Sequence, residues 1–112
     1  MSDPFSDRIA EKALAALREE NPETAAAGLR DALESAPERI DLMHALAVTE
    51  LRLGRAREAL TVVQKAQDIA EARRDGTSEM LMPQLMLVRA AAAEDLYDAT
   101  EAEAAFRMLL VH

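Results

Sequence analysis

Three apolar residues with helical spacing occur twice in this chain, at an offset of 34 residues. The two sets are Ala25, Leu29 and Ala32, and Ala59, Val63 and Ala66. Separations of four and three residues place each set on one face of an α-helix. A turn signal precedes each set, with Pro22 before the first and Gly54 before the second. This repeat predicts a chain that folds as successive helix–turn–helix units.

A third copy follows at a longer offset. The stretch LGRAREA, residues 53–59, aligns with LYDATEA, residues 96–102, at an offset of 43 residues. The same alignment places Phe106 opposite Val63. The additional residues lie around AEARRDGTSE, residues 70–79, between two expected helices.

Capping and helix-breaking residues predict six helices, over residues of about 4–20, 22–36, 38–53, 55–74, 78–95 and 99–112. Asn21 is expected to cap the second helix, and Pro22 suits its first position, where the missing amide needs no partner. Gly54 is expected to take the left-handed conformation after the third helix, and Asp75-Gly76 to close the fourth. Pro83 is expected to kink the fifth helix or to mark its late start. Short connections make sequential helices antiparallel.

The composition agrees with an all-α protein whose helices pack closely. Half of the 112 residues are hydrophobic but only 3% are aromatic, and the chain has only three glycines. Alanine supplies much of the apolar content; it is the best helix former, and its small side chain lets helices approach one another. A chain of this length makes one domain.

The central copy carries Met43, Leu46, Ala47, Gly54, Ala59, Val63 and Ala66 at spacings that define a known repeat. With the matching residues of the other copies, the sequence resembles the tetratricopeptide repeat (TPR) family. The resemblance implies a TPR-like α-solenoid of three antiparallel helical hairpins, with repeats over about 4–37, 38–76 and 77–112 of a single domain, 1–112. Glu50 stands where the family usually has an aromatic residue, and Tyr97 replaces the turn glycine. The longer second spacing resembles that of bacterial regulators and kinesin light chains.

The resemblance also implies a binding groove on the concave side, formed by the first helix of each hairpin. Carried over to this sequence, the groove positions are Asp41, His44, Val48, Leu51, Arg52, Gln84, Leu87 and Ala91. An apolar floor with polar edges suits an extended peptide or a partner helix. The resulting prediction is a protein–protein interaction module, an adaptor, scaffold or chaperone-like domain with a protein or peptide partner. Alternatively, groove residues simply pack against neighbouring helices.

Two apolar segments leave alternatives open. The stretch EMLMPQLMLV, residues 79–88, is either an adaptable methionine-rich binding surface or a layer buried on both sides. At the C-terminus the apolar residues cannot all face one core, and they form a candidate oligomer or partner surface: Phe106, Met108, Leu110 and Val111. Either the chain is cut from a longer protein, or the last helix pairs with another copy, or the segment is an aggregation-prone accident. The second possibility makes the chain a structural homo-oligomerisation domain, such as a homodimer, of a larger regulatory protein.

Other classes of function are disfavoured by the sequence. A formal net charge of −8, without a basic stripe, argues against nucleic-acid binding. The most apolar run, residues 80–93, is too short for a membrane span of ~30 Å, and the N-terminus lacks a secretory signal, so a cytoplasmic protein is expected. The chain has no cysteine, and its two histidines, His44 and His112, lack metal-ligand spacing. We therefore expect no enzyme, no cofactor and no metal site.

Overall fold

The computed structural model of the chain describes Arg8, Glu11, Ala15 and residues 21–111, and all its described elements are helices. The elements are α2 (Pro22–Ser35), α3 (Ile40–Arg52), α4 (Ala56–Arg73) and α5 (Gly76–Val111). This confirms the all-α class. The expected first helix, 4–20, lies outside the described residues, apart from the three isolated positions, whose backbone is helical.

The predicted signals set most of the helix ends. The Asn21 side chain accepts a hydrogen bond from the Thr24 amide at 3.3 Å, and Pro22 occupies the first position of α2. Gly54 follows α3 with a positive φ of 75°, as expected. The end of α4 differs from the prediction, because the left-handed residue is Arg74, with φ 51°, and Gly76 begins the next helix.

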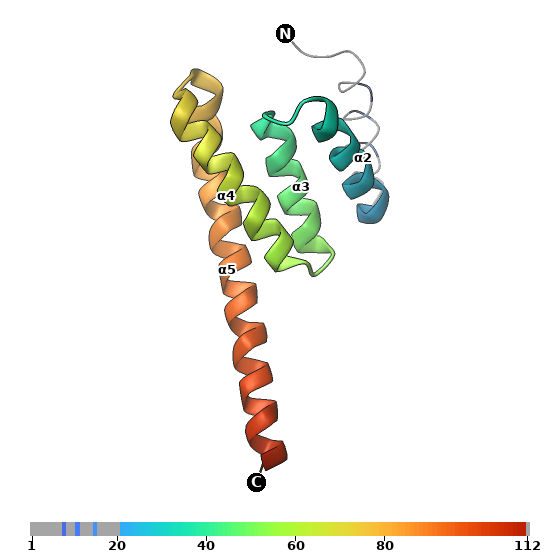
Figure 1. Cartoon of the computed structure of the whole chain (residues 1–112), viewed down its shortest axis with the longest axis vertical. Coiled ribbons are helices and arrows are strands. Elements are labelled where there is room, and N and C mark those ends of the chain that lie inside the picture. Colours follow the sequence, from blue (N-terminus) through green and yellow to red (C-terminus); the bar gives the residue numbers. More distant parts are fainter. Residues whose placement is uncertain (1–7, 9–10, 12–14, 16–20, 112) are drawn as a thin grey trace.

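Consecutive helices run antiparallel and lie side by side, from α2 through α3 and α4 to α5 (Figure 1). Each contacts the next, and α3 also contacts α5. As a result α3 and α5 run in the same direction, with α4 packed against both.

The repeated apolar sets form the core. All six residues of the two 34-residue-related sets are fully buried. Leu29 and Ala32 of the set on α2 pack with Leu42 and Leu46 of α3, whereas the set on α4 packs in a larger cluster with residues of α3 and α5. Burying each such side chain contributes on the order of 1 kcal/mol or more, so the repeat specifies how these helices stack.

The prediction of six helices in three hairpins is wrong. Residues 76–111 form one helix of 36 residues, which joins the expected fifth and sixth helices and shows no turn between them. The cause lies in residues 95–99, DLYDA, which contain neither glycine nor proline and so leave nothing to end the helix. Of the two alternatives for Pro83, a kink or a late start, the late start is wrong, since α5 begins seven residues earlier. The C-terminal part of α5 therefore runs on past the α3–α4 turn, with no other described helix beside it (Figure 1).

Candidate functional site

In the described part of the chain, no group of three or more histidine, cysteine, aspartate or glutamate side chains is placed to hold a metal ion. His44 is half-buried, and this burial lowers the pKa of its imidazole below the ordinary value of 6.5.

The predicted groove residues lie on α3 and α5. On α3, Asp41 and Arg52 are exposed near the two ends of the helix, and the three positions between them, His44, Val48 and Leu51, are half-buried. On α5, Gln84, Leu87 and Ala91 are exposed. Leu87 is the most notable of these, because a leucine that is 72% exposed leaves most of its apolar surface in water.

The 43-residue offset predicts that these two rows share one face, because it relates equivalent positions of α3 and α5. Leu42 on α3 is buried against α2, and its counterpart 43 residues later, Leu85, is buried in the cluster that α5 shares with α4. The same offset relates His44, which is half-buried, to Leu87, which is exposed. We call the predicted surface of His44, Val48, Leu51, Gln84, Leu87 and Ala91 the α3–α5 face.

The predicted C-terminal surface belongs to the last two turns of α5. The backbone of Phe106, Met108, Leu110 and Val111 is helical. Their side chains lie outside the described ones, so their role as a partner surface stays a prediction.

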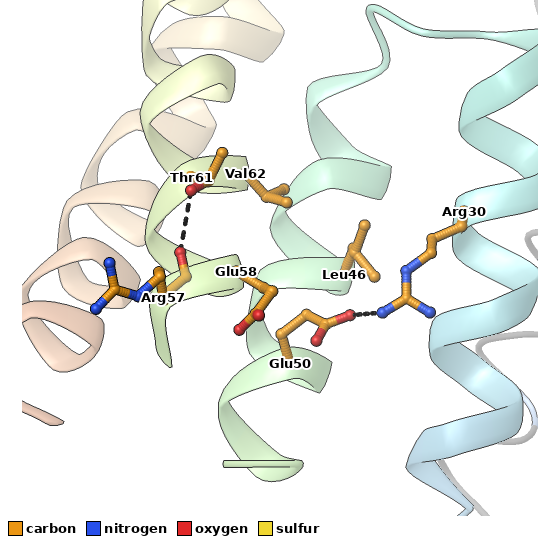
Figure 2. A pocket seen from close by; sticks show the side chains of 7 residues that line it. All are labelled: Arg30, Leu46, Glu50, Arg57, Glu58, Thr61 and Val62. Atoms are coloured by element: carbon orange, nitrogen blue, oxygen red, sulfur yellow. Dashed lines mark hydrogen bonds and ion pairs between the residues drawn. The ribbon is translucent and has the colours of Figure 1, made fainter. Parts of the chain in front are cut away.

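A hollow of about 370 Å³ lies between α2, α3 and α4, and Figure 2 shows its lining side chains. It contains none of the predicted groove residues. At its base is Glu50 of α3, whose side chain is 2% exposed. Arg30 reaches across from α2 to form an ion pair and hydrogen bond with Glu50 Oε1, and the guanidinium of Arg55 lies 3.6 Å from Oε2. Two cations thus neutralise one buried carboxylate.

This charged hollow is best explained as a structural brace. The one hydroxyl among its lining residues, that of Thr61, donates to the backbone carbonyl of Arg57 one turn earlier in α4. The buried carboxylate is occupied by the ion pairs that hold α2 and the α3–α4 turn to α3. Sequence reasoning noticed Glu50 as a departure from an aromatic position. It missed Arg30, because nothing in the sequence links two residues that are 20 positions apart.

Further hollows lie between α4 and α5, and two of them adjoin one another along the seam of these helices. The volumes of these two are about 450 and 370 Å³, and Met86 lines both of them. The α5 residues along this seam include Met82, Met86, Ala90 and Ala93, and the α4 residues include Gln67 and Ala70. We call this surface the α4–α5 face. Sequence reasoning missed it as a surface because the expected sixth helix would have folded back and packed beside the fifth.

The methionine-rich segment is divided between core and surface. Leu85 and Val88 are buried, whereas Met80, Met86 and Leu87 are exposed. In this structure the segment is therefore not buried on both sides.

Comparison of the chain with protein-family models, curated proteins and solved structures gave no match. The resemblance to tetratricopeptide repeats consequently stays a prediction from the residues. In the described part of the chain, no helix combines the length and apolar character that crossing a membrane requires. What the fold defines is a small all-α protein of consecutive antiparallel helices, one of which leaves apolar side chains exposed.

Proposed function

We propose that this chain is a protein–protein interaction module that binds a peptide or helix on the α3–α5 face. One observation carries the proposal. Among the side chains that the structure describes, the exposed large apolar residues all belong to α5: Met80, Met86, Leu87 and Tyr97. Of these, Leu87, which is 72% exposed, is the one in the α3–α5 face. Apolar side chains gathered on one helix are typical of a surface that a partner covers.

The α3–α5 face fits a partner with apolar side chains and basic flanks. Leu87 and Ala91 offer exposed apolar surface, and Val48 and Leu51 lie half-buried on the neighbouring helix. The chain has a formal net charge of −8, so the field around the face favours a basic partner. A helix laid along such a face would place its anchors at intervals of three and four residues.

A displayed library of random peptides tests the proposal. We expect the wild-type chain to enrich peptides that combine apolar anchors with lysine or arginine. Binding of an enriched peptide should fall by about tenfold or more in a Leu87→Glu plus Ala91→Glu variant, since each change adds a charge to an exposed apolar contact.

The matched control adds the same two charges elsewhere. Gln64→Glu plus Thr77→Glu changes exposed positions of α4 and α5 that lie outside the face. Equal loss of binding in both variants would show that net charge, and not the α3–α5 face, determines binding. Circular dichroism confirms that each variant keeps its helices.

A further inference from the structure

The α4–α5 face is equivalent to a surface that the chain covers in its preceding hairpin. Met43, Ala47 and Glu50 of α3 are all buried, and α4 folds back to lie beside them. Their counterparts 43 residues later, Met86, Ala90 and Ala93, are exposed, and Met86 is 58% exposed. The difference arises because α5 continues straight on, so no helix of the described chain returns to cover them.

An apolar stripe joins this uncovered face to the protruding end of α5. Separations of three, four and seven residues keep one side of a helix in line. Exposed residues at these separations are Met86, Ala90, Ala93, Tyr97 and Ala104. The sequence continues the same spacing at Met108 and Val111. The molecule therefore carries both an uncovered hollow and a helical segment with the same apolar spacing.

We infer that two copies of this chain pair in antiparallel fashion along α5, with residues 97–111 of each copy in the hollow between α4 and α5 of the other. A continuous helix cannot bring its own end back to its own hollow. A second copy can supply that end. Such an exchange of identical surfaces is what a two-fold symmetric dimer requires.

The two segments of α5 on either side of Tyr97 have equal lengths, and this defines the register of the antiparallel pair. The stretch from Pro83, in the hollow, to Tyr97 spans 14 residues, and the stretch from Tyr97 to Val111 also spans 14, or about 21 Å each. The symmetry axis then passes near Tyr97, which is 65% exposed, and Ala90 of one copy lies opposite Ala104 of its partner. Alanines at these positions let the helices approach closely. The two-fold doubles every contact, which helps the pairing to approach the roughly 1,600 Å² of a stable interface.

Cysteine cross-linking tests the register, because the natural chain has no cysteine. Full-length Tyr97→Cys should form a disulfide-linked dimer on mild oxidation, since the symmetry axis brings the two copies of this position together. Ala90→Cys chains mixed with Ala104→Cys chains should cross-link, whereas each variant alone should remain largely uncross-linked. Cross-linking of each alone as readily as of the mixture would indicate a parallel pairing and overturn the inference.

Light scattering of the full chain at micromolar concentration tests the pairing itself. We expect twice the mass of one chain. Met86→Glu should weaken self-association by about tenfold or more, because it places a carboxylate in the covered stripe. Met80→Glu is the matched control: Met80 is equally a methionine of α5 and is 72% exposed, but it lies off the stripe, so the dimer should persist. A wild-type monomer, or equal weakening by both changes, would overturn the inference and leave peptide binding at the α3–α5 face untouched.

Discussion

Glu50 is a buried carboxylate in a protein with few aromatic side chains. It remains buried because Arg30 and Arg55 neutralise its charge from the two elements that flank α3. A buried ion pair of this kind contributes little to stability beyond what an apolar pair would, but breaking it leaves an uncompensated charge. The Arg30–Glu50 pair therefore contributes more to the position of α2 against α3 than to the stability of the fold.

Replacing Arg30 alone should destabilise the protein. We expect Arg30→Ala to lower the free energy of unfolding by roughly 1–3 kcal/mol, less than the full cost of orphaning a buried charge, because Arg55 remains. Arg30→Met combined with Glu50→Met should recover most of this loss. Arg107→Ala is the control, since its ion pair with Glu103 is exposed and should be worth under about 1 kcal/mol. Urea unfolding measures all three, and equal losses for Arg30 and Arg107 would contradict the role of the buried pair.

His44 should make stability depend on pH. Burial lowers the pKa of His44 in the folded chain below 6.5, so the unfolded chain binds the proton more readily. Stability should therefore be greatest above that value and fall as the pH drops through it towards the lower folded pKa. His44→Gln should flatten this dependence between about pH 8 and pH 5. Unfolding midpoints across the range provide the measurement.

At the scale of elements, the sequence predicted α2, α3 and α4 well because local signals agree with the tertiary packing there. Asn21 with Pro22 begins α2, and Gly54 ends α3, as their chemistry requires. The sequence did not predict that α5 is continuous. The repeat alignment places a turn at Tyr97 by analogy with Gly54, although no residue near Tyr97 breaks a helix. Similarly, the 43-residue offset was enough to name the residues of the α3–α5 face. The α4–α5 face could not be predicted in this way, because it is exposed only where α5 continues without a turn.

Pro83 should be a weak point of α5. It lies inside the helix and has no amide to donate to the carbonyl of Glu79. Pro83→Ala should restore that hydrogen bond and stabilise the protein by up to about 3 kcal/mol, seen as a higher thermal midpoint. Pro37→Ala, in the connection between α2 and α3, should give no such gain. An unchanged or lower midpoint for Pro83→Ala would show that the local packing depends on the proline ring.

The whole molecule is elongated. Its radius of gyration is 16.0 Å, whereas a compact chain of this length would have about 13 Å, and its extents are 60 × 31 × 20 Å. The long dimension comes from α5, which spans about 54 Å. A small protein with so much of its chain in one projecting helix exposes apolar surface that a compact bundle would bury.

Small-angle scattering should report an unusual relation between mass and length. In the antiparallel pair, each α5 extends about 32 Å on the body side of Tyr97, from Gly76 onwards. The dimer should therefore have a longest dimension near the 60 Å of one chain, despite twice the mass. A particle close to twice that length would indicate end-to-end association and contradict antiparallel pairing.

The order of contacts along the chain has a consequence for how the protein forms. Among the described helices, each packs on its neighbours in sequence. The one other pair of described helices in contact is α3 and α5. Such short-range topology carries a low entropic barrier to loop closure and favours rapid folding. Structure can nucleate at any adjacent pair of helices and spread outwards, and the outermost helices can open without melting the centre.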